Sequence, residues 1–171
     1  MRPKSSVLLP VFFVLAVSGG SWLSEARGEE PNASQAITVN PIFMTAGWFN
    51  AEYERTLTSA STWGASYSRF APGGKNAGGY RGVKAVWRYY PRGTVLQGKW
   101  LGLRAGRSRL WDQSIATFYS LVGLEMGYTE AFGPSQRIVM SLGLGASRLF
   151  GGPEDFPKVF PSLRANIGVA W

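Results

Sequence analysis

The sequence contains no cysteine and no histidine, and it is short of charge. Without cysteine, disulfide scaffolds, thiolate nucleophiles and cysteine-ligated zinc sites are excluded. Without histidine, the chain lacks the residue behind Ser-His-Asp triads, most general acid–base catalysis and most metal sites. Charged residues make up 16% of the chain, whereas a typical soluble domain has about 25%. We therefore expect a protein that is not an enzyme, with no catalytic residue, no metal and no cofactor.

The residues that are abundant point to a different class of protein. The 171 residues suffice for one domain of ordinary size, and they include 22 glycines and 14% aromatic residues. The net charge is +8, which suggests an anionic partner without saying which one. Nucleic acid is the usual interpretation of such a charge, and the N-terminus argues against it.

Residues 1–26 have the layout of a secretory signal peptide. Arg2 and Lys4 precede an apolar run over residues 7–17, and small residues follow at Ser24 and Ala26. Such a run is too short for a transmembrane helix of about 20 residues, so a cleavable signal is favoured. Cleavage after Ala26 fits best and cleavage after Gly28 nearly as well, which leaves residues 27–35 as a flexible leader. Export argues against nucleic acid as a partner, so none is expected.

The rest of the chain alternates apolar and polar residues with the period of β-strands. No window in it has a convincing helical period. Eight alternating segments are expected, at residues 37–45, 47–58, 61–71, 79–91, 97–110, 116–131, 137–150 and 160–171. If the break near residue 46 is not real, the first two merge and the count is seven.

The connections between these segments fall into two kinds. Short connections are expected at residues 58–61, 92–96 and 133–136, and mostly longer ones at 71–78, 111–115 and 151–159. With eight strands, all the short connections and both chain ends lie at one end of the array. This asymmetry is typical of outer-membrane barrels. The pattern predicts an all-β fold, an eight-stranded antiparallel up-and-down transmembrane β-barrel over residues 36–171.

The distribution of side chains favours a membrane barrel over a soluble one. Aromatic and large apolar residues lie near strand ends, as in the interfacial belts of lipid-embedded barrels. Those expected at the short-turn end are Trp63, Trp87, Tyr89, Phe132 and Trp171, and those at the long-loop end are Phe49, Tyr80, Leu110, Phe118 and Phe160. The polar face is rich in glycine and serine, which suits the narrow interior of an eight-stranded barrel.

Two sets of charged residues are candidates for function. Unpaired charges inside a narrow barrel are too costly, so the mid-strand charges of the polar face are expected to form ion pairs. These are Glu52, Glu54, Glu125, Lys84, Arg88, Arg104 and Arg164. A second set near the long loops is expected to contact lipid phosphates, because the forked guanidinium suits phosphate. It consists of Arg69, Arg81, Arg107 and Arg109.

Three short motifs carry a resemblance to a known family. They are "NAEYERTL" at residues 50–57, "WRYYPRG" at residues 87–93 and the terminal aromatic Trp171. Over residues 36–171 the chain resembles small Gram-negative outer-membrane β-barrel proteins, and most closely a barrel domain family with no assigned activity. The resemblance implies location in the outer membrane, and it implies that the barrel-assembly machinery reads Trp171 as an assembly signal.

The expected function is therefore non-enzymatic. We expect a monomeric outer-membrane barrel with a lumen filled by side chains, and a role in envelope integrity or in surface interaction with lipopolysaccharide and other outer-membrane lipids. The alternative is a secreted, soluble, lipocalin-like barrel that binds a small apolar ligand. A porin-like diffusion channel would need a wider lumen than eight strands provide.

Overall fold

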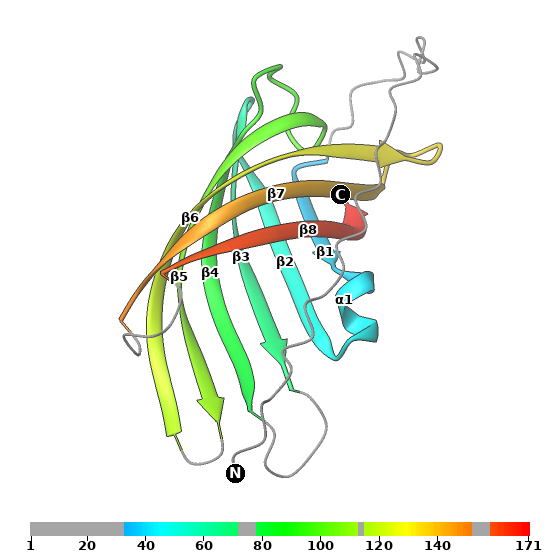
Figure 1. Cartoon of the computed structure of the whole chain (residues 1–171). Coiled ribbons are helices and arrows are strands. Elements are labelled where there is room, and N and C mark those ends of the chain that lie inside the picture. Colours follow the sequence, from blue (N-terminus) through cyan, green and yellow to red (C-terminus); the bar gives the residue numbers. More distant parts are fainter. Residues whose placement is uncertain (1–32, 72–77, 113–114, 152–157) are drawn as a thin grey trace.

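The computed structural model describes residues 33–71, 78–112, 115–151 and 158–171, which form a closed antiparallel barrel (Figure 1). Each strand pairs with its neighbours in the sequence, and β1 pairs with β8 to close the sheet. The strands are β1 (Gln35–Val39), β2 (Trp48–Thr58), β3 (Ser61–Phe70), β4 (Gly79–Tyr89), β5 (Gly98–Asp112), β6 (Ile115–Phe132), β7 (Ile138–Phe150) and β8 (Val159–Ala170). The predicted all-β class and eight-stranded barrel are confirmed. The segment predicted as a signal peptide lies outside the described residues, and β1 begins at the last residue of the predicted leader.

The strand predicted at residues 37–45 is wrong in its second half. The backbone leaves the sheet after Val39 and forms a short helix, α1 (Pro41–Thr45). Asn40 caps this helix, because its side-chain oxygen accepts a hydrogen bond from the Phe43 amide at 3.0 Å. Pro41 then occupies the first turn, where its missing N–H costs nothing. The helix separates β1 from β2, so the count of eight strands stands. No helix among the described residues is long and apolar enough to cross a membrane.

Short connections join β2 to β3, β4 to β5 and β6 to β7 at one end of the barrel, called here the short-turn end. The carboxyl end of β8 lies at the same end, because Trp171 is hydrogen-bonded to the start of β1. The other end, called here the long-loop end, carries α1 and the remaining three connections (Figure 1). Most residues of those three connections lie outside the described part of the chain.

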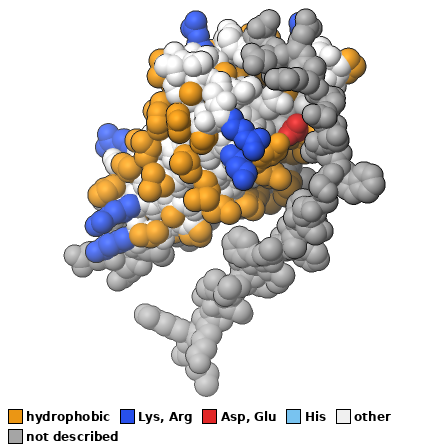
Figure 2. Space-filling view, turned by 90° about the horizontal axis from the view of Figure 1, so that it is seen from above, with side chains coloured by type: hydrophobic (Ala, Val, Ile, Leu, Met, Phe, Trp, Pro, Cys, Tyr) orange, Lys and Arg blue, Asp and Glu red, His pale blue; other side chains and the backbone are white. Residues whose placement is uncertain are grey.

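The two faces of the sheet differ sharply in chemistry. Small and polar residues face the interior, and large apolar residues face outward. On β7, for example, Ser141 is 3% exposed, while Leu142 and Leu144 of the same strand are 54% and 61% exposed. Figure 2 shows one side of the outer surface, where apolar side chains cover much of the wall. The interior of this protein is therefore rich in polar and charged residues, and its outer wall is apolar.

Glycines on the inward face let the strands curve tightly. A Cβ atom on Gly106 of β5 would come within 2.2 Å of the Val83 carbonyl oxygen, and one on Gly64 of β3 would come within 2.0 Å of the Tyr53 oxygen. No side chain fits at such a distance, so only glycine allows the adjacent backbone to approach. At these two positions the small residue predicted for the polar face is required by the approach of the neighbouring strand.

A small apolar cluster lies inside the barrel at the short-turn end. Leu96, from the turn between β4 and β5, is 4% exposed and packs with Ala36, Val139 and Ala170. Its backbone has φ 62°, in the left-handed region, which is uncommon for a residue other than glycine. The surrounding packing holds it there, and the turn folds into the barrel mouth. We call this group the apolar plug.

Part of the predicted aromatic arrangement is wrong. The sequence predicts that Tyr80, Leu110 and Phe160 face outward. Each of them, however, is two positions along its strand from a residue that faces the interior, and residues two apart on a strand share a face. Tyr80 shows the consequence, because its hydroxyl accepts a hydrogen bond from the buried Ser108 at 3.2 Å. Its ring also packs beside Trp48 and Tyr119. The alternation continues to the strand end, so these three residues belong to the long-loop mouth of the lumen.

Candidate functional site: a charged lumen and an outer arginine recess

The middle of the lumen holds a network of three carboxylates and three guanidinium groups. Glu52 and Glu54 come from β2, where the alternation places both on the inward face. Arg88 comes from β4, two strands away, and its guanidinium reaches both of them. Arg88 Nη2 lies 2.6 Å from Glu52 Oε1, an ion pair without hydrogen-bond angles, and Nη1 donates to Glu54. Arg88 is 1% exposed, so its charge is balanced by protein groups alone.

Two further arginines complete the charge balance. Arg164 of β8 contacts Glu52 at 2.5 Å, so Glu52 lies between two guanidinium groups. Arg104 of β5 contacts Glu125 of β6 at 2.6 Å. The six groups carry three negative and three positive charges, so the network is neutral as a unit. Pairing of opposite charges lowers the cost of burying them.

Hydroxyl groups satisfy the remaining oxygen of Glu54. Thr62 donates to its Oε1 at 2.5 Å and Tyr90 donates to the same atom at 2.8 Å. Tyr90 follows the end of β4 and is 1% exposed. Burial and the adjoining Glu54 carboxylate raise the pKa of Tyr90 well above its usual value, so Tyr90 remains a hydrogen-bond donor.

Trp100 fills the lumen beside the charged network. The guanidinium of Arg88 lies 4.6 Å from the centre of its ring, and that of Arg164 lies 5.8 Å from it. The Trp100 indole nitrogen donates to Thr129 at 3.1 Å, so the polar end of this fully buried residue is also satisfied. A Cβ on Gly127 would come within 2.4 Å of the ring. Trp100 and the arginines around it thus occupy the middle of the lumen.

The sequence predicted the composition of this network well. Glu52, Glu54, Glu125, Arg88, Arg104 and Arg164 all take part in the ion pairs described above. Lys84 does not, since none of the described carboxylates lies within 4.0 Å of it. It occupies the inward face of β4, between Gly106 of β5 and Ser66 of β3 in the register. Among the described residues, no group of acidic side chains is arranged to hold a metal ion.

The four arginines predicted near the long loops all lie on the outward face. Arg69, Arg81 and Arg109 occupy directly paired positions on β3, β4 and β5, so they form a row across three strands. Arg107 is two residues from Arg109 on the same face of β5. None of the four has an ion pair with any carboxylate that the structure describes. The site therefore presents a local excess of positive charge.

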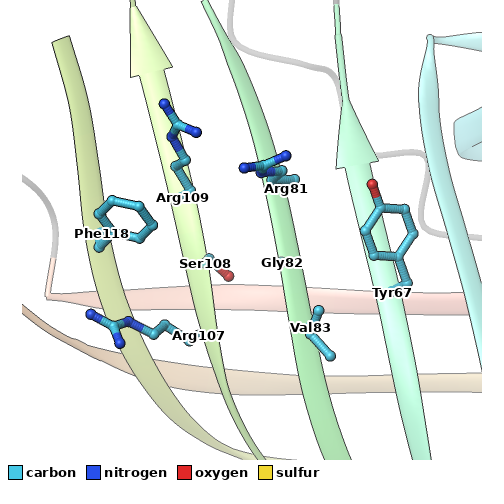
Figure 3. Close-up of a pocket in the computed structure, with 8 residues that line it drawn as sticks. All are labelled: Tyr67, Arg81, Gly82, Val83, Arg107, Ser108, Arg109 and Phe118. Carbon is cyan, nitrogen blue, oxygen red and sulfur yellow. The ribbon is translucent and has the colours of Figure 1, made fainter.

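A recess lies beside this row, with a volume of about 320 Å³. Figure 3 shows Arg81 between Arg109 and Tyr67, with Val83 farther along β4. Phe118 of β6 lies against both arginines of β5, with the guanidinium carbons of Arg107 and Arg109 at 5.5 and 5.6 Å from its ring centre. We call this feature the arginine recess. It combines cationic groups with apolar walls.

Trp171 closes the seam between the first and last strands. Its carbonyl oxygen accepts hydrogen bonds from the Ser34 and Gln35 amides, both at 2.9 Å, and its own amide donates to Gln35. Its side chain is 46% exposed on the outward side. The backbone of Trp171 thus helps to close the barrel, while its side chain is exposed on the outer surface.

Several residues of both sites were not found from the sequence. Trp100, Tyr90 and Thr62 were not predicted as partners of the charged network, because their roles depend on which strands pair and in which register. Phe118 was predicted as an interfacial aromatic, but its place between two arginines was not. The spacing Arg107-x-Arg109 on one face of a strand was the available signal for that second feature.

The comparisons with known proteins give no relative. No family model matches the chain, and no significant match is found among the curated proteins or the solved structures.

Proposed function

We propose that the protein is a monomeric outer-membrane β-barrel of a Gram-negative bacterium that performs no chemical reaction. Its lumen is filled by side chains, and its role is in the integrity of the envelope or in binding lipopolysaccharide at its outer surface. The proposal rests on one observation above all, the inverted burial of the barrel. Glu52, Glu54 and Glu125 are 6 to 9% exposed, whereas Leu124 and Leu144 are more than 60% exposed.

The outer surface supports this proposal because it is poorly suited to water. Among the described residues, thirty large apolar side chains are exposed, most of them on the outward face of the strands. Contiguous apolar patches on soluble monomers are rarely larger than a few hundred Å². Each Å² of apolar surface moved out of water stabilises by roughly 25 cal/mol, so a lipid surrounding removes a large hydration cost. Closure of the barrel also pairs all edge strands, as a span through lipid requires.

The lumen argues against the lipocalin-like alternative. A barrel that binds a small apolar ligand needs an apolar cavity in its interior. Here Arg88, Trp100 and Glu52 occupy the middle of the lumen, and the apolar plug occupies the short-turn end. The same filling argues against a diffusion channel.

The location can be tested by expressing the full chain in a Gram-negative host. We expect it to sediment with the outer membrane, to resist extraction with alkaline carbonate or urea, and to migrate faster on gels before boiling than after. Purified protein should also float with lipid vesicles in a density gradient. Recovery of folded protein in the soluble periplasmic fraction would refute the membrane proposal and favour the lipocalin-like alternative.

A further inference from the structure

The arginine recess has the features of a binding site for a specific lipid. It lies on the outward wall over β3, β4, β5 and β6, away from the lumen network. Its lining includes three guanidinium groups, from Arg81, Arg107 and Arg109, and three apolar side chains, from Tyr67, Val83 and Phe118. A ligand that matches it must carry both negative charge and apolar groups.

The arrangement of charges in the recess favours the binding of an anion. Arg81 is directly paired with Arg69 on one side and with Arg109 on the other, and like charges in directly opposite positions destabilise a sheet. The Nε atom of Arg109 is buried without a hydrogen-bond partner among the described residues. An oxyanion at this point would separate the like charges and supply the missing acceptor. Guanidinium groups bind phosphate through paired, charge-assisted hydrogen bonds.

Phe118 sets the geometry of the two arginines on β5. Its ring lies against both guanidinium groups at nearly equal distances, which is a favourable cation–π arrangement. The contact restricts both long side chains before any ligand arrives. Preorganisation of this kind lowers the entropy that binding must otherwise offset.

A strip of small residues leads from the recess toward the middle of the barrel wall. Ala65, Ala85 and Ala105 occupy directly paired positions on β3, β4 and β5 and face outward. Next to them on the same face lie Tyr67, Val83 and Arg107, which line the recess. Small side chains here leave room along the wall for a hydrocarbon chain that begins at the recess. The direction is that expected for a lipid whose headgroup lies at the long-loop end.

We propose that the arginine recess binds one molecule of an acylated lipid that carries a phosphate monoester, the headgroup chemistry of lipid A in lipopolysaccharide. The phosphate lies between Arg81 and Arg109, with Arg107 as a third cation. An acyl chain extends past Val83 along the alanine strip. This inference rests on the proposed function, because the recess meets such a lipid only if the barrel spans the outer membrane.

The test uses the full chain, purified in a mild detergent, and native mass spectrometry with added lipid A. We expect one tightly bound lipid A per protein, with weaker binding of lipid A from which the phosphates have been removed. The double variant Arg81→Gln/Arg109→Gln should bind lipid A at least tenfold more weakly, which is about 1.4 kcal/mol. Added salt should weaken binding to the unaltered protein, since the contacts are partly exposed.

Two further variants separate the recess from general charge effects. Arg148→Gln is the matched control, because Arg148 also faces outward near the long loops and lies over an aromatic ring, that of Phe150, at 5.5 Å, but it does not line the recess. It should leave lipid A binding within about a factor of two. Ala85→Leu keeps every charge and fills the alanine strip, and it should weaken lipid A binding while leaving binding of inorganic phosphate unchanged.

Four results would overturn this inference. These are unchanged binding in the double variant, an equal loss in Arg148→Gln, equal binding of dephosphorylated lipid A, and displacement of lipid A by inorganic phosphate at similar concentration. The last result would indicate a site for free phosphate. Vesicle flotation and gel migration of the double variant serve as the separate readout. If they remain normal while lipid A binding proves nonspecific, the inference fails and the membrane proposal survives.

Discussion

Removal of the Glu52 carboxylate should destabilise the barrel strongly, because it leaves a buried cation unpaired. In the structure Glu52 contacts Arg88 at 2.6 Å and Arg164 at 2.5 Å. After Glu52→Ala, Arg88 keeps Glu54, but Arg164 loses its only ion pair with a described carboxylate. Breaking a buried pair by removing one partner costs about 3–5 kcal/mol, which sets the expected loss in the free energy of unfolding.

Urea titration of the protein in lipid vesicles can measure this loss through tryptophan fluorescence. With a slope of about 1–3 kcal/mol per molar urea, the unfolding midpoint should fall by at least about 1 M. Glu130→Ala is the control, because Glu130 lies at the short-turn end and accepts a hydrogen bond from Tyr128 on the outward face. That variant should change stability by no more than about 0.5 kcal/mol.

A double-mutant cycle tells whether the loss comes from the pair itself. In the background of Arg164→Ala, the removal of Glu52 leaves no unpaired guanidinium at position 164. The double variant should therefore be more stable than the sum of the two single effects predicts, by about 0.5–3 kcal/mol. Equal and small effects of Glu52→Ala and Glu130→Ala would refute the reasoning, since they would mean that the lumen carboxylates are solvated.

Three further outcomes are expected. Gly106→Ala should impair folding, measured as a lower fraction of heat-modifiable protein, because the added Cβ would lie 2.2 Å from its nearest neighbour. Gly102→Ala on the same face of β5 should be tolerated, because the corresponding distance is 3.3 Å. Similar yields of the two variants would contradict the close-approach argument. Trp100→Ala should lower the free energy of unfolding by about 3–5 kcal/mol, as for other buried aromatics, and a loss under 1 kcal/mol would mean that the lumen is not filled as described. Trp171→Ala keeps the backbone bonds of the seam. In pulse-chase experiments it should lower the amount of assembled protein, while Trp171→Phe remains normal, as expected for an assembly signal. Normal assembly with lower thermal stability would limit Trp171 to interfacial anchoring.

Most of the strands could be predicted from the sequence, because the alternation of apolar and polar residues is a local pattern. Residues 137–150 alternate without interruption, and β7 spans Ile138–Phe150. The helix α1 was missed because its apolar residues extended the preceding pattern, although Asn40 followed by Pro41 is a helix-start signal. At the strand ends the sequence predicts the wrong side for Tyr80, since an aromatic residue near a strand end is typical both of a lipid interface and of a lumen mouth.

The candidate sites were predictable in composition and not in geometry. Alternation places charges of both signs on the inward face, and six of the seven predicted charges do pair in the narrow lumen, whereas Lys84, on the same face, does not. Which carboxylate meets which guanidinium depends on the register between strands. Glu54 and Arg88, for example, are 34 positions apart in the sequence. The arginine recess likewise arises from the pairing of β3, β4 and β5, which no single segment specifies.

The seam between β1 and β8 has a consequence for the order in which the barrel forms. It joins Gln35 to Trp171, so it links segments at opposite ends of the described chain, while every other strand pair joins sequence neighbours. Closing a longer loop costs more chain entropy, and contacts between distant segments slow folding. The hairpins can therefore form before the circle is complete. Until β8 meets the five residues of β1, the sheet has two open edges that could pair with another chain. The period of greatest risk of aggregation is thus the interval before the seam closes.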